Sequence, residues 1–148
     1  MSARVILDTG PLVALLVARE QHHEWAKRQF ALVEPPLFTC EAVLSECLYL
    51  LAPYEPGVMA VVEMLRRGVI ALPFQFSREV ESVSRLLHKR RDVPASFADA
   101  CLIRMSEQST DVKIMTLDSD FTVYRRHGRQ PIPLIMPDDS MGTADLGK

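Results

Sequence analysis

The chain has 148 residues, which is enough for one domain whose core is large enough to fold unaided. Hydrophobic residues make up 48% of the chain and charged residues 24%, the balance expected of a soluble globular protein. The net charge of −2 argues weakly against a nucleic-acid ligand, because proteins that bind the phosphate backbone usually carry an excess of Lys and Arg.

The start of the chain does not predict a secretory signal peptide. Asp8, Gly10 and Pro11 interrupt the apolar segment that follows Arg4. The next apolar run, residues 12–18, is too short to span a bilayer. The three cysteines form no C-x-x-C pair, which disfavours a zinc site, and an odd, sparse set suits a reducing compartment. We therefore expect a cytoplasmic protein with no membrane contact.

Strand and helix patterns alternate along the chain. Short apolar runs predict strands, and apolar residues at helical spacing predict helices. In chain order these are strand 5–7, helices 12–18 and 22–33, strand 37–39, helices 41–52 and 56–67, strand 69–72, helices 77–91 and 96–108, and strands 113–116 and 133–136. Residues 1–136 are therefore expected to form one domain, followed by a polar, mobile tail of residues 137–148.

Short strands that alternate with helices predict an α/β fold with a central parallel sheet, covered by helices on both faces. Ligands of such sheets bind beyond the carboxyl ends of the strands. Asp8 directly follows the first predicted strand, and Asp118 follows the strand 113–116. If these two strands are neighbours, the two carboxylates meet at one edge of the sheet. Alternatively, Asp8 forms only a local turn, and Asp118 and Asp120 only start a short helix through residues 123–126.

Helical geometry singles out Glu46 as a further candidate. Glu46 shares one face of the predicted helix 41–52 with Ala42, Val43 and Leu50, so it is not expected to point into bulk water. A buried carboxylate must be paired, protonated or bound to a metal. The alternatives are a helix end turned toward solvent or a pair with an arginine.

Asp99 has two possible roles. It lies three residues after Ser96, which is the spacing of a capping box at a helix start. It also shares a helical face with Leu102 and Ile103 and so leans toward the core. Capping explains Asp99 taken alone, whereas several inward or strand-end acids in one small domain point to a site.

A cluster of carboxylates needs a compensating cation, because like charges at contact distance raise one or more pKa values. The usual ion for a site of oxygen ligands is Mg²⁺ or Mn²⁺. Such an ion can activate a water molecule for attack on a phosphodiester. The acids therefore favour a metal-dependent nuclease.

Four segments carry a resemblance to a known family: ILDTGPLVALL, TCEAVLSECLYLL, VPASFADACLIRM and IMTLDSDFTVYRRHGR. In this order they resemble the signature segments of PIN-domain ribonucleases, especially the VapC-type toxins of bacterial toxin–antitoxin pairs. The resemblance extends from Arg4 to about Met136. It implies a three-layer α/β/α sandwich with a central parallel sheet, acids that bind Mg²⁺ or Mn²⁺, and cleavage of single-stranded or looped RNA.

The resemblance also assigns residues to the site. The catalytic acids that it implies are Asp8, Glu46, Asp99 and Asp118. The metal ligands that it implies are Asp8, Asp99, Asp118 and Asp120. Thr116 matches a hydroxyl residue beside the acids, and Thr9 is expected to support them.

The basic residues suggest a contact surface for RNA. Without the five candidate acids, the remaining chain has more basic than acidic residues, because the whole chain has 17 Lys and Arg and 19 Asp and Glu. Arg125, Arg126 and Arg129 follow the acids Asp118 and Asp120 closely and are candidates for phosphate contacts. The alternative is a solvated helix end.

The sequence therefore predicts a metal-dependent endoribonuclease that leaves 5′-phosphate and 3′-hydroxyl ends. By resemblance its partners are an RNA substrate, a small antitoxin and a second copy of the chain. A phosphatase with an aspartyl-phosphate intermediate would need a D-x-D arrangement, whereas this chain has Asp8-Thr9-Gly10. A catalytically inactive PIN-like scaffold that binds RNA or protein is the other alternative, and loss of one of the acids would indicate it.

Overall fold

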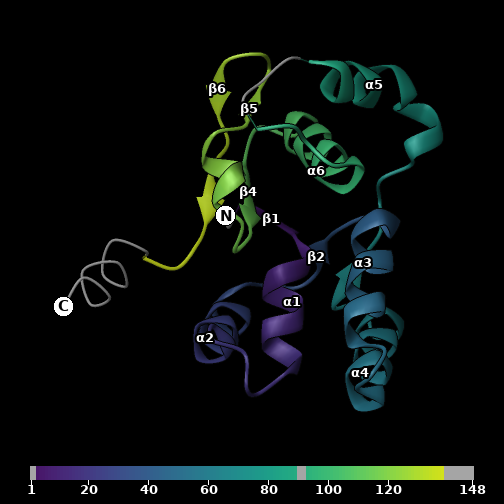
Figure 1. Cartoon of the computed structure of the whole chain (residues 1–148), viewed down its shortest axis with the longest axis vertical. Helices are drawn as coiled ribbons and strands as arrows, with labels where there is room; N and C mark the ends of the chain where they lie inside the picture. Colours follow the sequence, from purple (N-terminus) through teal and green to yellow (C-terminus); the bar gives the residue numbers. More distant parts are fainter. Residues whose placement is uncertain (1–2, 90–92, 139–148) are drawn as a thin grey trace.

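The computed structural model describes residues 3–89 and 93–138 and is built around a parallel sheet (Figure 1). The sheet has five strands in the order β3-β2-β1-β4-β7. They are β1 (Arg4–Leu7), β2 (Leu37–Phe38), β3 (Ile70–Ala71), β4 (Val112–Met115) and β7 (Leu134–Ile135). All four pairings are parallel, which confirms the predicted parallel sheet. The central neighbours β1 and β4 pair Ile6 with Ile114 and Leu7 with Met115.

Helices cover both faces of this sheet, as the sequence predicted. On one side lie α1 (Thr9–Leu16), α2 (His23–Leu32), α3 (Glu41–Leu51) and α4 (Glu55–Arg66), and on the other α5 (Val80–His88) and α6 (Phe97–Glu107). Successive residues of β1 point to opposite faces. Val5 and Leu7 pack in the cluster that contains α1 and α4, while Ile6 packs in the cluster that contains α5 and α6. The fold is therefore a three-layer α/β/α sandwich.

Helix α1 begins earlier than predicted. The sequence placed its start at residue 12, but the helix begins at Thr9. The Asp8 carboxylate caps it by accepting a hydrogen bond from the backbone N–H of Thr9. Pro11 lies in the first turn, where its missing N–H has no intrahelical partner to lose. The end of β1 and the start of α1 therefore meet at a carboxylate.

The segment before α5 also differs from the prediction. Ser77 was expected to cap a helix, but it lies inside a short 3₁₀ helix, Phe76–Arg78, and makes no capping hydrogen bond. Phe76 packs edge-to-face on Phe97, with the ring centroids 4.9 Å apart, which holds this segment against the start of α6. The predicted end of the helix at Arg91 lies outside the described residues. The predicted capping box of Ser96 and Asp99 is confirmed.

A small hairpin follows the acids of the C-terminal half. The short helix considered for residues 123–126 is absent: the chain forms a 3₁₀ helix, Ser119–Thr122, and then an antiparallel pair, β5 (Arg125–Arg126) and β6 (Gln130–Pro131). His127 and Gly128 have φ values of 52° and 86°. Glycine adopts this left-handed conformation readily, so the turn rather than helix propensity decides the local structure.

Two further expectations concern the C-terminal tail and the absence of a membrane-spanning helix. The predicted tail is described only to Asp138, and the rest of it lies outside the described residues. In the ranges 3–89 and 93–138, the helices are all too short or too polar to cross a bilayer.

A pair of leucine substitutions tests the core. Leu102 of α6 is fully buried, whereas Leu32 at the end of α2 is 78% exposed. Leu102→Ala should lower the free energy of unfolding by about 2–5 kcal/mol because it leaves a cavity. Leu32→Ala should change it by less than about 0.5 kcal/mol. Urea unfolding measures both, and equal midpoints for the two variants would contradict this packing.

Candidate active site

An acidic pocket opens at the carboxyl ends of the central strands. It has a volume of about 490 Å³. Its lining comprises Asp8, Thr9, Gly10, Glu46, Leu50, Ser96, Asp99, Leu117 and Asp118. Four of the acids that the sequence analysis selected therefore face one pocket, although they come from different elements. Among residues 3–89 and 93–138, no Lys, Arg or His lines it.

Asp8 is the most deeply held of these acids. Its side chain is 8% exposed. One carboxylate oxygen accepts a hydrogen bond from the Thr9 backbone N–H at 2.8 Å. The other accepts from the Thr116 hydroxyl at 2.7 Å. The orientation of the Asp8 carboxylate is therefore fixed by two donors, one from α1 and one from the end of β4.

Thr116 connects two of the candidate acids. Its side chain is fully buried, and while its hydroxyl donates to Asp8, the same oxygen accepts the backbone N–H of Asp118 at 2.9 Å. Thr9 contributes through its backbone and also donates its hydroxyl to the Val43 carbonyl at 3.4 Å, a long contact. Both threonines thus lie where the sequence analysis expected supporting residues.

The environment of Asp8 disfavours its charged form. Burial raises the pKa of the Asp8 carboxyl to about 6, although the hydrogen bonds from Thr116 and Thr9 oppose the rise. The negative charges of Asp99 and Glu46 raise this pKa further. No basic side chain of the described lining compensates the charge of these acids within the pocket.

Asp99 fills both roles that the sequence left open. It closes the capping box, since its Oδ2 accepts the Ser96 backbone N–H at 3.2 Å. The same oxygen accepts the Tyr124 hydroxyl at 2.9 Å. Within the described residues, Oδ1 of Asp99 accepts no hydrogen bond, so the carboxylate is anchored on one side only. It lies in the pocket with Asp8.

Tyr124 is a residue that the sequence analysis missed. It is 1% exposed, and its ring packs edge-to-face on Phe121 at 5.1 Å. Burial and the hydrogen bond to Asp99 raise the pKa of the Tyr124 hydroxyl, so it stays protonated and acts as a donor. No local pattern marks this contact, because the partners are 25 residues apart.

Asp118 and Asp120 lie at the turn after β4. Oδ1 of Asp118 accepts the Asp120 backbone N–H at 2.9 Å, so Asp118 caps the 3₁₀ helix. Asp120 does not line the acidic pocket. Its pKa is nevertheless raised, first by desolvation and then by the charges of Asp118 and Asp99. Asp118 therefore caps the 3₁₀ helix and also lies close enough to Asp120 for their charges to interact.

The expectation that Glu46 avoids bulk water is wrong. Its side chain is exposed at the pocket. The buried residues of α3 are instead Val43, Leu44, Cys47 and Leu51. Leu50, which shares the predicted apolar face with Glu46, is 51% exposed. On this side of α3, Glu46 and Leu50 face the pocket while Val43 is buried in the core, a distinction that helical periodicity does not make.

The three candidate arginines differ in their surroundings. Arg126 donates to the Ser106 carbonyl at 2.9 Å, and its Nε is buried without a hydrogen-bond partner. Arg125 donates to three nearby carbonyl oxygens of residues 122–124. The side chain of Arg129 is exposed, with no hydrogen bond or ion pair to a described residue. None of the three lines the acidic pocket.

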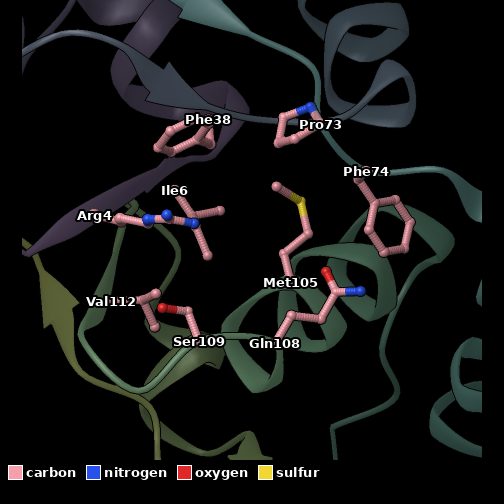
Figure 2. Close-up of a pocket in the computed structure, with 9 residues that line it drawn as sticks. All are labelled: Arg4, Ile6, Phe38, Pro73, Phe74, Met105, Gln108, Ser109 and Val112. Carbon is pink, nitrogen blue, oxygen red and sulfur yellow. The ribbon is translucent and has the colours of Figure 1, made fainter.

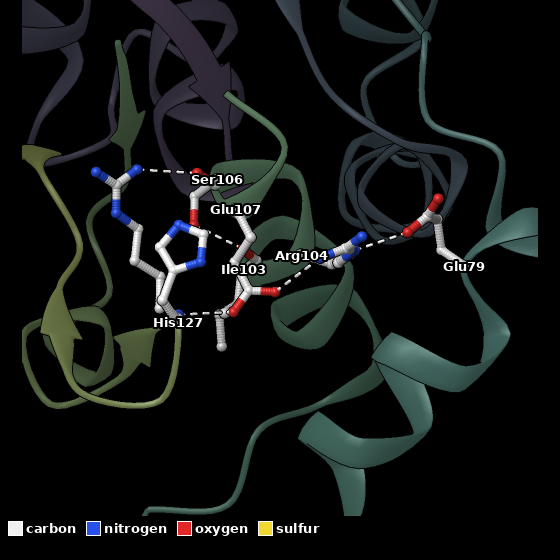
Figure 3. A network of polar contacts seen from close by, with 7 residues as sticks. Glu79, Ile103, Arg104, Ser106, Glu107 and His127 are labelled. Carbon is white, nitrogen blue, oxygen red and sulfur yellow. Dashed lines mark hydrogen bonds and ion pairs between the residues drawn. The ribbon is translucent and has the colours of Figure 1, made fainter. Parts of the chain in front are cut away.

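A polar network fixes the hairpin to α6 (Figure 3). Arg104 bridges Glu79 at 2.7 Å and Glu107 at 3.3 Å. Glu107 in turn accepts the backbone N–H of His127 at 2.8 Å. Together with the bond from Arg126 to Ser106, these contacts hold the segment that leads from Asp118 through Tyr124 against the helix that carries Asp99.

A second pocket has a different character (Figure 2). It has a volume of about 140 Å³ and includes Phe38, Phe74 and Met105 among its walls, with the Arg4 guanidinium 5.7 Å from the centroid of the Phe38 ring. No Asp, Glu, His or Cys lines it. Because it offers no acid–base or metal-binding group, the acidic pocket is the candidate active site.

The acidic pocket has the donor type and charge that suit a hard cation, because carboxylate oxygens are the ligands that Mg²⁺ and Mn²⁺ prefer. However, no three His, Cys, Asp or Glu side chains in residues 3–89 and 93–138 form a group that could hold a metal ion. The acids are therefore spread around one pocket in this structure, and their role as metal ligands stays a prediction. Asp99 and Asp118 are held by their caps, and like charges repel.

Comparison with known proteins identifies the architecture. The family model described as PIN domain matches residues 5–126. A search of curated proteins finds no match. Among solved structures, the crystal structure of Mycobacterium tuberculosis VapC20, described as a toxin that cleaves the sarcin–ricin loop, superposes with a TM-score of 0.72. It is 22% identical in sequence, and the match covers 80% of this chain and 93% of VapC20, so the likeness concerns the fold.

The raised pKa of Asp8 predicts how stability depends on pH. The folded protein holds the Asp8 proton more tightly than the unfolded chain, so wild type loses stability relative to Asp8→Asn as pH rises from about 4 through about 6. Without divalent cations, the free energy of unfolding of Asp8→Asn should match that of wild type near pH 4. Near pH 8 it should be higher than that of wild type by as much as about 3 kcal/mol.

Denaturant unfolding in EDTA across this pH range measures the difference. Asp111→Asn is the matched control, because Asp111 is an exposed acid outside the pocket. Parallel stability curves for wild type and Asp8→Asn over the whole range would show that burial does not perturb this carboxyl.

Proposed function

The chain belongs to the PIN-domain family, and we propose that it is a metal-dependent endoribonuclease. The observation that carries the proposal is the pocket that Asp8, Glu46, Asp99 and Asp118 line together, with no basic side chain among its described lining residues. The family match over residues 5–126 includes all four acids. None of the acids is missing, which disfavours the alternative of a catalytically inactive scaffold.

In this proposal Asp8, Asp99, Asp118 and Asp120 would be drawn together by one or more Mg²⁺ or Mn²⁺ ions, because in the described residues no three of them already form a metal site. When bound, the ion would neutralise charge on the phosphodiester and make a water molecule a better nucleophile. The hydrogen bonds of Thr9 and Thr116 keep the Asp8 carboxylate turned toward the pocket. The hydroxyl of Tyr124 keeps one side of Asp99 occupied and leaves the other side available.

Glu46 is suited to a different role. Its carboxylate is exposed at the pocket rather than fixed by a described hydrogen bond, so it can accept a proton from the attacking water. Cleavage by water would place the phosphate on the 5′ end of the downstream product and leave a 3′-hydroxyl on the upstream one. Mapping of the product ends distinguishes this from attack by the 2′-hydroxyl of the RNA.

We further propose that the nuclease is the toxin of a type II toxin–antitoxin pair that acts in the cytoplasm. The support is the structural likeness to VapC20, whose description names both a toxin and an RNA loop. The proposed partners are RNA, a small antitoxin and a second copy of the chain. Co-purification with the product of an adjacent small gene tests the toxin assignment separately from the nuclease activity.

Substitution of Asp8 tests the nuclease. Asp8→Asn removes a negative charge that orients the cation, an effect of roughly 4 kcal/mol on the transition state. This corresponds to a loss of about a thousandfold in rate. The assay follows cleavage of a sarcin–ricin loop hairpin and of a pool of single-stranded RNAs with Mg²⁺ or Mn²⁺.

An EDTA reaction and Asp111→Asn serve as controls for this assay. Asp111→Asn should cleave as wild type does, and EDTA should abolish cleavage. Cleavage that persists in EDTA, or in Asp8→Asn, would refute the metal mechanism. Binding of RNA or of a protein partner with no cleavage of any RNA would favour the scaffold.

Two arginines of the hairpin should respond differently. Arg129→Ala should weaken RNA binding and reduce the slope of log K against log salt by about one, because it removes a phosphate contact. Arg126→Ala should instead lower the melting temperature, because it removes the bond to the Ser106 carbonyl. Salt titrations of RNA binding and thermal melts of both variants measure these effects. A smaller salt slope for Arg126→Ala than for Arg129→Ala would show that Arg126, not Arg129, makes the phosphate contact.

A further inference from the structure

A groove adjoins the acidic pocket. It runs between one side of α3 and the start of α6 and has a volume of about 740 Å³. Glu46 and Ser96 line both the groove and the acidic pocket, so the two spaces are neighbours. A chain whose phosphate lies among the acids can therefore extend directly into the groove.

Two aromatic side chains line this groove from opposite elements. Tyr49 of α3 is 78% exposed, and Phe97 of α6 is 44% exposed. Phe97 is held in place by Phe76, whose ring lies edge-to-face with it at an interplanar angle of 87°. Within the described residues, the Tyr49 side chain makes no ring contact and no hydrogen bond. Large aromatic surfaces left open beside a site mark a contact surface.

The charge of the groove restricts what it can bind. The described residues that line it include the acids Glu41 and Glu46 and no basic side chain. Two carboxylates repel a phosphate, so the groove does not suit the RNA backbone. It suits a flat, neutral group with a π-face, and every nucleobase offers one that stacks on aromatic rings.

We propose that this groove binds a nucleobase of the RNA substrate, stacked on Tyr49 or Phe97, next to the phosphate that is cleaved. The inference rests on the proposed nuclease function and adds a base-binding subsite to it. It assigns phosphate and base to separate compartments: the phosphate to the acidic pocket and the neighbouring base to the aromatic groove.

Substitutions of the two rings test the stacking. Tyr49→Leu and Phe97→Leu keep apolar bulk and remove the π-face, whereas Tyr49→Phe is a matched control that keeps the ring. All three are made in the Asp8→Asn background, so that RNA is bound but not cut. Affinity is measured for an RNA that wild type cleaves and for the same RNA with an abasic residue on either side of the cleaved phosphate.

Loss of stacking should weaken binding of the intact RNA by about 5- to 100-fold for at least one of the Leu variants. Tyr49→Phe should stay within about twofold of its parent. On the RNA whose abasic residue replaces the stacked base, the affected Leu variant and its parent should bind equally. A 2-aminopurine at this position should change its fluorescence on binding in the parent and not in that variant.

The outcomes separate this inference from the function on which it rests. If wild type cleaves RNA but both Leu variants bind it like their parent, the base-binding subsite is wrong and the nuclease stands. If either variant changes the oligomeric mass in solution and leaves RNA affinity unaltered, the groove is a protein interface instead. If wild type cleaves none of the RNAs tested, the proposed function fails and the subsite with it.

Discussion

The hydrogen bond from the Thr116 hydroxyl to the Asp8 carboxylate is the interaction on which the acidic pocket depends. It joins residues 108 positions apart, and it forms because β1 and β4 are parallel neighbours that end side by side. The Asp8 backbone N–H adds a bond to the Met115 carbonyl at 3.0 Å. Since Thr116 also accepts the N–H of Asp118, one buried hydroxyl sets the position of two acids.

This arrangement works against stability. A carboxylate that is 8% exposed and faces other acids is costly to ionise, and its raised pKa records that cost. Both faces of the sheet compensate through well-buried layers that include Leu7 on one side and Ile114 on the other. Strain at a functional site is sustained where the surrounding structure determines it strongly. Here the paired strands β1 and β4 determine the position of Asp8, and the pocket lies at their carboxyl ends.

Much of the fold was predictable because its signals are local. Short apolar runs alternate with segments whose apolar residues have helical spacing, and this alternation predicted the parallel sheet and its two helical layers. Ser96 predicted the start of α6. The turn at His127 and Gly128 shows where prediction from local signals fails. The hairpin depends on backbone conformation and on contacts with α6 that are distant in sequence.

The candidate site was predictable in part for the same reason. Acids at strand ends are visible in the sequence, and the structure places Asp8 and Asp118 at one pocket. The surroundings of Glu46 were misjudged, because a helix can turn an apolar side toward a pocket as well as toward a core. The contact between Tyr124 and Asp99 has no local pattern and appears only once the hairpin is packed against α6.

The use of arginine in this chain bears on how it could recognise RNA. Arg104 and Arg126 are engaged in holding the hairpin on α6, and Arg125 is bound to carbonyls of its own turn. Among the described residues, the lining of the pocket and of the groove beside it contains carboxylates and aromatic rings and no basic side chain. The described lining therefore supplies no basic side chain that would attract RNA. Attraction of RNA to this surface requires a cation among the acids to neutralise the phosphate, with stacking to hold the neighbouring base. The acids would then contribute to binding through the cation, so removing the metal should weaken both binding and cleavage, whereas Asp8→Asn alone, with the other acids in place, should impair mainly cleavage.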